Sequence, residues 1–120
     1  MIKQFLLVGF GGAVGSVLRY AGNLLYGNKS FPATTFFINI IGSFVLGIVI
    51  GYCLKTGPAA NNWKLLLATG LCGGFTTFSA FSLENFQLIQ EGKLMLSLLY
   101  IFSSVILGIA AAWLGLKIIN

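Results

Sequence analysis

The chain has 120 residues, of which 58% are hydrophobic and only 8% are charged. A soluble domain of this size carries about 25% charged residues, so the polar surface is too small to cover a water-soluble particle and the composition indicates a membrane protein. The seven basic residues give a net charge of +5 but are scattered singly, which argues against a nucleic-acid partner. With no histidine and only Glu84 and Glu91 as carboxylates, acid–base catalysis is poorly supplied, and we expect no enzyme.

The charged residues divide the chain into four apolar segments. A helix needs about 20 residues to cross the hydrocarbon core of a bilayer. We therefore expect an all-α integral membrane protein, with residues 1–120 forming a single four-helix transmembrane domain. The expected spans lie near residues 4–25, 33–54, 63–90 and 94–117.

The distribution of basic residues hardly favours one orientation of the chain in the membrane over the other. With four spans both termini share a side, and the two sides carry nearly equal sets: Lys3, Lys55, Lys64 and Lys117 against Arg19, Lys29 and Lys93. Orientation normally follows an excess of lysine and arginine in cytoplasmic loops. Two hypotheses stay open: a weak bias towards one orientation, or insertion in both orientations followed by pairing of antiparallel copies.

The middle of the third span contains poor helix formers. Gly73, Gly74, Thr76 and Thr77 lie within five positions and predict a break near residues 73–77. Irregular backbone at membrane depth is tolerated only inside protein or beside water, so this segment faces a subunit interface or a cavity. The carbonyls of the first half could hold a small cation, and the N–H groups of the second half favour an anion. A glycine kink that serves packing alone is an equally weighted explanation.

Aromatic, hydroxyl and amide side chains surround this break. Phe78 and Phe81 lie three residues apart, and the edge of a phenyl ring is electropositive. Asn39 lies in the middle of the second span, where polar groups tend to mark transport pathways. Core packing remains the alternative role for the two phenylalanines. Arg19 could reach the membrane interface along its stem or pair with Glu84.

Small and polar residues recur at every fourth position in three spans. They are Gly11 and Gly15; Asn39, Ser43, Gly47 and Gly51; and Tyr100, Ser104, Gly108 and Ala112. Residues four apart share one helix face, and small residues there let helix backbones approach closely in lipid. We expect the glycines to serve helix packing.

Three motifs resemble a known family. The run GLCGGFTTFSAFSLE (70–84) is similar to the signature of the Fluc, or CrcB, fluoride channels. The segments GGAVGSVLRY (11–20) and TFFINIIGS (35–43) resemble the family in the first and second spans, and the likeness covers the whole chain.

This resemblance implies a passive, fluoride-selective channel that exports cytoplasmic fluoride across the bacterial inner membrane. It implies an antiparallel, dual-topology homodimer with two pores and no organic cofactor. The pore residues that it implies are Asn39, Thr77, Phe78, Ser79, Phe81, Tyr100 and Ser104. Arg19 and Glu84 match charged positions near the vestibules. The backbone carbonyls of Gly73 and Thr76 match the ligands of a structural sodium ion at the dimer interface.

The chain departs from the family in the fourth span. Where the family often has a further hydroxyl one turn after Ser104, this chain has Gly108. The polar track is then either shorter or completed by Ser103, Ser97 or water.

Two other functions remain as alternatives. A small multidrug-resistance-like exporter also has four spans, but it uses a carboxylate deep in the first span, where this chain has only Arg19 as an ionisable residue. A non-transporting membrane assembly protein would account for the small-residue stripes. It would not account for Asn39 within a span or for the phenylalanine–serine series.

Overall fold

The computed structural model describes residues 1–27 and 32–120, and the regular elements in this part of the chain are all helices. The elements are α1 (Ile2–Tyr26), α2 (Ala33–Thr56), η1 (Pro58–Ala60), α3 (Asn61–Trp63), η2 (Lys64–Cys72), α4 (Gly73–Phe75), α5 (Phe78–Gln90) and α6 (Leu94–Ile119). Four described segments are long and apolar enough to cross a membrane: Ile2–Tyr26, Ala33–Thr56, Pro58–Gln90 and Leu94–Ile119. The four expected spans each fall within one of them, so the all-α membrane class is confirmed. Lys29 lies outside the described residues.

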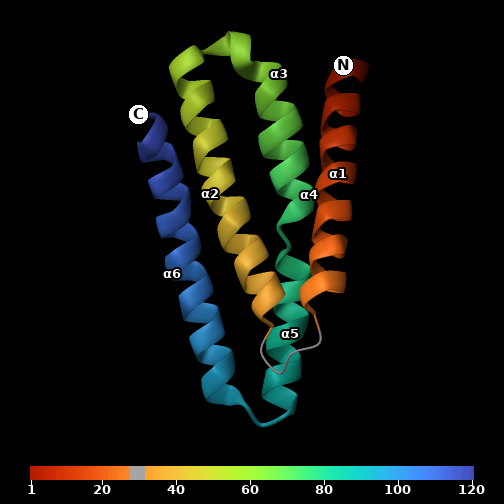
Figure 1. The fold of residues 1–120 in the computed structure, drawn as a ribbon, viewed down its shortest axis with the longest axis vertical. Helices are drawn as coiled ribbons and strands as arrows, with labels where there is room; N and C mark the ends of the chain where they lie inside the picture. The colour runs from red at the N-terminus through yellow and green to blue at the C-terminus, as the bar shows by residue number, and fades with distance from the viewer. Residues whose placement is uncertain (28–31) are drawn as a thin grey trace.

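The helices run along the long axis of the molecule, as Figure 1 shows. The molecule is 50 Å long, which exceeds the hydrocarbon core of a bilayer, about 30 Å thick. Both termini and the connection from α2 to α3 lie at one end, and the turn between α5 and α6 lies at the other. The end that holds the termini therefore carries Lys3, Lys55, Lys64 and Lys117, and the other end carries Lys93.

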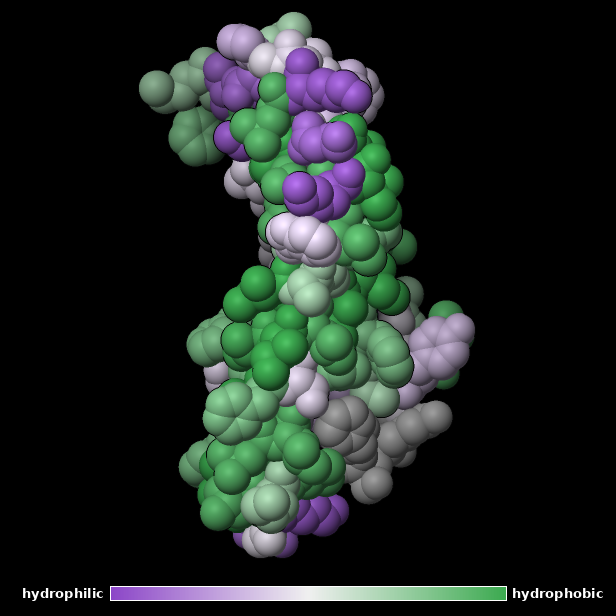
Figure 2. Space-filling model, turned by 90° about the vertical axis from the view of Figure 1, so that its left-hand side faces the viewer, coloured by the Kyte–Doolittle hydropathy of each residue, from purple (hydrophilic) through white to green (hydrophobic). Residues whose placement is uncertain are grey.

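The surface of the molecule is apolar and its small interior is partly polar. Large side chains such as Phe5, Leu24 and Ile109 are 71%, 68% and 68% exposed. Figure 2 shows this apolar surface as a green band with hydrophilic residues gathered at the two ends. Ser97 and Tyr100, in contrast, are fully buried. A water-soluble protein has the opposite arrangement, so this surface suits contact with lipid.

Glycines let two pairs of helices meet backbone to backbone. A Cβ atom added to Gly15 of α1 would overlap the carbonyl of Leu71 and would lie 2.7 Å from the backbone nitrogen of Phe75. A Cβ atom added to Gly47 of α2 would overlap the carbonyl of Ala112 on α6. The expectation that these glycines serve helix packing is confirmed, because only hydrogen fits at such contacts.

The third span is broken, but by its threonines and not by its glycines. Gly73 and Gly74 lie within the helical turn α4, whereas Thr76 and Thr77 have extended backbones, with ψ angles of 155° and 124°. Gly74 is needed elsewhere, since a Cβ atom there would overlap the carbonyl of Gly12 on α1. The break therefore falls within residues 73–77 as expected, but Gly73 and Gly74 do not form it, and Gly74 serves helix packing. The π-helical stretch η2, which precedes the break, was not expected.

Candidate functional site

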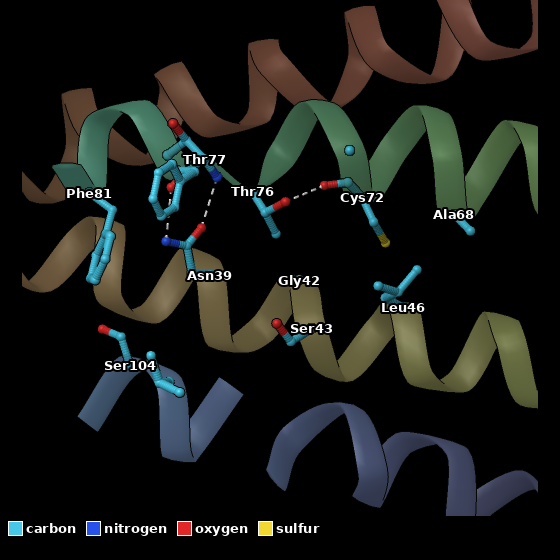
Figure 3. Close-up of a pocket in the computed structure, with 13 residues that line it drawn as sticks. Asn39, Gly42, Ser43, Leu46, Ala68, Cys72, Thr76, Thr77, Phe81 and Ser104 are labelled. Carbon is cyan, nitrogen blue, oxygen red and sulfur yellow. Dashed lines mark hydrogen bonds between the residues drawn. The ribbon is translucent and has the colours of Figure 1, made fainter. Parts of the chain in front are cut away.

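The break is held by the side chain of Asn39 from α2. Its Nδ2 donates a hydrogen bond to the carbonyl of Thr77 over 3.1 Å, and the backbone N–H of Thr77 donates to its Oδ1 over 2.8 Å. Figure 3 shows this pair of bonds between α2 and the break. A carboxamide presents a donor and an acceptor side by side, so it replaces the two backbone bonds that the break removes. Asn39 thus satisfies a peptide group that would otherwise be costly within a membrane.

The second half of the broken span begins with a strong cap. Thr77 is the N-cap of α5, and its Oγ1 accepts a hydrogen bond from the backbone N–H of Ala80 over 3.1 Å. The same oxygen lies 3.2 Å from the hydroxyl of Ser79, with which it shares a further hydrogen bond. The N-terminus of a helix carries partial positive charge, so the start of α5 is a favourable place for an anion.

A groove of about 380 Å³ lies beside the break, between α2, the third span and α6. Figure 3 shows the residues that line it. They are Asn39, Gly42, Ser43, Leu46, Ala68, Cys72, Gly73, Thr76, Thr77, Phe78, Phe81, Ser104 and Val105. None of these residues carries a charge, and the polar ones offer hydroxyl groups and an amide. The groove can therefore present hydrogen-bond donors to an anion without the strong attraction of a lysine or arginine.

Ser104 on α6 supplies an unpaired hydroxyl to this groove. Among the described residues, its Oγ is the one buried side-chain oxygen or nitrogen that has no hydrogen-bond partner. Buried polar atoms are nearly always paired in folded proteins, so an exception needs an explanation. A serine hydroxyl can donate to an anion, and that is a role that its position in the groove permits.

The two phenylalanines of the motif stand in different surroundings. Phe78 is 79% exposed, although it lies next to the break in the middle of the third span. Phe81 is half-buried, and its ring meets the ring of Tyr100 edge to face at a centroid distance of 4.9 Å. The rings of Phe78 and Phe81 are 5.9 Å apart. The ring of Phe81 is thus partly covered by the rest of the molecule, and the ring of Phe78 is exposed.

Tyr100 belongs to a second polar cluster and does not line the groove. Its hydroxyl donates to Oε1 of Glu84 over 2.8 Å, and the hydroxyl of Thr35 donates to Oε2 of the same carboxylate over 2.6 Å. No role was expected for Thr35, which is only 2% exposed. Its spacing of four residues from Asn39 was a signal that could have revealed it, because both lie on one face of α2.

Arg19 does not pair with Glu84. Its Nε donates to the carbonyl of Gly74 over 3.1 Å, close to the end of α4. Across residues 1–27 and 32–120, the one ion pair joins Lys93 to Glu91. The carbonyl ends of helices carry partial negative charge, so the guanidinium stabilises the first half of the broken span. The hypothesis of an Arg19–Glu84 pair is therefore wrong.

Gly73 and Thr76, the candidate ligands of a cation, both line the groove. In a continuous α-helix the N–H of Thr77 would bond to the carbonyl of Gly73, but here it donates to Asn39. The nearest neighbour of a Cβ atom added to Gly73 would be the carbonyl of Ala68, at 4.0 Å. The described residues contain no group of three His, Cys, Asp or Glu side chains that could hold a metal ion. A cation at this point would be held by carbonyl oxygens, which suit sodium.

Comparison with known proteins identifies the family. The family described as "CrcB-like protein, Camphor Resistance (CrcB)" matches residues 6–116. The chain belongs to the CrcB-like family. Together with its four membrane-spanning helices, this membership makes it a multi-pass membrane protein.

Relatives within the CrcB-like family match over nearly their full length. The chain is 49% identical over 118 residues to the "Fluoride-specific ion channel FluC" of Azobacteroides pseudotrichonymphae, covering 96% of this chain and 94% of the relative. It is 45% identical over 120 residues to the protein of the same name from Flavobacterium psychrophilum, covering 98% and 97%. The corresponding protein of Thermus thermophilus is 42% identical over 120 residues, covering 98% and 95%. The resemblance to the Fluc (CrcB) family is confirmed.

Proposed function

We propose that this protein is a passive fluoride channel that exports cytoplasmic fluoride across the bacterial inner membrane. Its relatives are named as ion channels and not as enzymes, and their names specify fluoride. The observation that carries the proposal is the uncharged groove at the broken span, with the unpaired hydroxyl of Ser104 inside it.

The groove would hold fluoride by several weak contacts. The hydroxyl of Ser104, the N-terminal end of α5 and the edges of Phe78 and Phe81 all favour a negative charge. None of these contacts is a full positive charge, so the ion can leave again. Tyr100 donates its hydroxyl hydrogen to Glu84, so in this arrangement it positions the path. Asn39 uses one of its two Nδ2 hydrogens for Thr77, so the second can be donated to the ion.

The working unit that we propose is an antiparallel, dual-topology homodimer with two pores. Phe78 lies at the edge of the groove and is 79% exposed, so a second copy packed against the break would cover it. The near balance of basic residues between the two ends would let copies insert in both orientations. Each groove would then be completed by an aromatic ring from the neighbouring copy.

The proposal includes a sodium ion at the same interface. Two copies meeting at the break would bring together four carbonyl oxygens, from Gly73 and Thr76 of each. The bound ion would offset the partial negative charge of these oxygens and so tie the two breaks together. The carbonyl of Gly74 already accepts a hydrogen bond from Arg19 of α1, so the guanidinium charge lies on the side of α4 that faces α1.

Dual topology predicts a mixed labelling pattern. Cysteines placed at Lys55 and Lys93, which are exposed at opposite ends of the molecule, should each react with a membrane-impermeant thiol reagent from both sides of the membrane. We expect roughly half of the copies to react from each side, because orientation is almost unbiased. The unmodified protein, which has Cys53 and Cys72, supplies the background signal. Reaction of each position from one side only would contradict dual topology.

Fluoride efflux from liposomes tests the function. Purified protein in liposomes loaded with potassium fluoride should release fluoride, read with an electrode, only after valinomycin supplies the potassium counter-flux. Liposomes loaded with chloride should show no release. Replacing Phe78 and Phe81 by isoleucine should reduce fluoride efflux by at least about tenfold, because an aliphatic side chain has no electropositive ring edge. Unchanged efflux in the double variant would assign these rings to packing, and no efflux from the folded unmodified protein would refute the function.

A further inference from the structure

The α2 side of the groove carries a hydroxyl group to which the proposed pore gives no role. Ser43 lies one helical turn after Asn39 on α2, so the two side chains share a face. Both line the groove. Figure 3 shows the Ser43 hydroxyl in the space between α2 and α6, further along the groove than Ser104.

The residue of α6 that faces Ser43 is Gly108, which has no side chain and is not itself among the lining residues of the groove. Gly108 lies one turn after Ser104, so the two share a face of α6. A Cβ atom added to Gly108 would have Ser43 Oγ as its neighbour at 3.8 Å, an ordinary van der Waals contact. The Ser43 hydroxyl therefore stands beside the place where a side chain at Gly108 would begin.

The other serines of α6 do not reach this level of the groove. Ser97 is completely buried, and its hydroxyl donates to Oδ1 of Asn85 over 2.9 Å. Ser103 is not among the lining residues. Thr76 also lines this part of the groove, but its hydroxyl already donates to the carbonyl of Cys72 over 2.8 Å. The other side chains here are apolar: Leu46, Ala68, Cys72 and Val105. An anion that leaves Ser104 in this direction would lose its hydrogen-bond donors unless Ser43 supplies one, and a charge without donors is costly to hold in such surroundings.

We propose that Ser43 provides the second hydroxyl of the fluoride path, so that the path crosses from α6 to α2 at Gly108. This inference rests on the proposed fluoride channel and assigns a fluoride-contacting residue within its pore. Ser104 and Ser43 donate to the ion in turn. A glycine at 108 leaves the space through which the Ser43 hydroxyl faces the path.

Moving the hydroxyl across the groove tests this assignment. Ser43→Ala should lower the fluoride efflux rate about tenfold, since a hydrogen bond to an ion is lost from the path. Adding Gly108→Ser to this variant places a hydroxyl on α6 beside the position that the Ser43 hydroxyl occupied, where the space admits a Cβ atom. The double variant should recover efflux to within about threefold of the unmodified protein. Ser103→Ala, the same substitution on a serine outside the groove, should leave the rate unchanged.

Three outcomes would overturn the assignment. Efflux of Ser43→Ala equal to that of Ser103→Ala would show that the hydroxyl is not used. A double variant as slow as Ser43→Ala, with both running as folded protein on size-exclusion chromatography, would show that the loss came from packing. Absence of fluoride efflux from the folded unmodified protein would instead refute the fluoride channel itself, and this assignment with it.

Discussion

Replacing Asn39 with leucine is expected to abolish fluoride efflux and to destabilise the protein by about 3 kcal/mol. The side chain makes two hydrogen bonds to Thr77, one to its carbonyl and one from its N–H. Leucine has a similar size but neither a donor nor an acceptor. Both peptide groups would then be left without partners in the middle of the membrane, and the start of α5 would lose its position beside the groove.

Thermal unfolding in detergent, read as the loss of the folded peak on size-exclusion chromatography, measures this effect alongside liposome efflux. Asn23→Leu is the matched control, because it makes the same change on an exposed asparagine near the end of α1. The control should keep both stability and efflux. If Asn39→Leu matched Asn23→Leu in stability, the role given to Asn39 at the break would be wrong.

A second large effect is expected from replacing Gly15 with valine. A Cβ atom at this position would overlap the carbonyl of Leu71 and crowd the backbone nitrogen of Phe75, so α1 would have to move away from the third span. Overpacking of this kind costs about 3 kcal/mol where backbone cannot yield. The displacement would also pull Arg19 from the carbonyl of Gly74 and so weaken the end of α4.

Gly9→Val is the control for this prediction. Gly9 lies on the same helix, and a Cβ atom added there would meet nothing within 4 Å. The same thermal measurement should therefore show a large drop for Gly15→Val and almost none for Gly9→Val. Equal losses in the two variants would mean that the α1 contact with the third span contributes little to stability.

The sequence predicted those features of this protein that the membrane requires of any chain that crosses it. A bilayer demands long apolar segments and tolerates few charges, so the four spans could be predicted from composition and charge spacing. The same demand made Asn39 conspicuous, because an amide at that depth must find partners. The weak helix formers between residues 73 and 77 predicted the break for a similarly local reason, namely low helix propensity.

The partners of each polar side chain depended on the tertiary structure. Sequence spacing suggested that Arg19 could meet Glu84, yet the guanidinium bonds to the carbonyl of Gly74. The Tyr100 hydroxyl bonds to Glu84 and leaves Ser104 as the α6 hydroxyl in the groove. Such choices follow from distances between helices that lie far apart in the chain, and no local pattern encodes those distances.

The chain by itself thus determined that this is a four-span membrane protein with a polar, broken third span, and its motifs indicated the CrcB-like family. Only the packing of the helices decided that Gly74 next to the break serves contact with α1, while the threonines carry the break. Only that packing placed Ser43 opposite Gly108. The physical reason is that hydropathy and propensity act within one segment, whereas backbone contacts and hydrogen-bond partners are settled between segments.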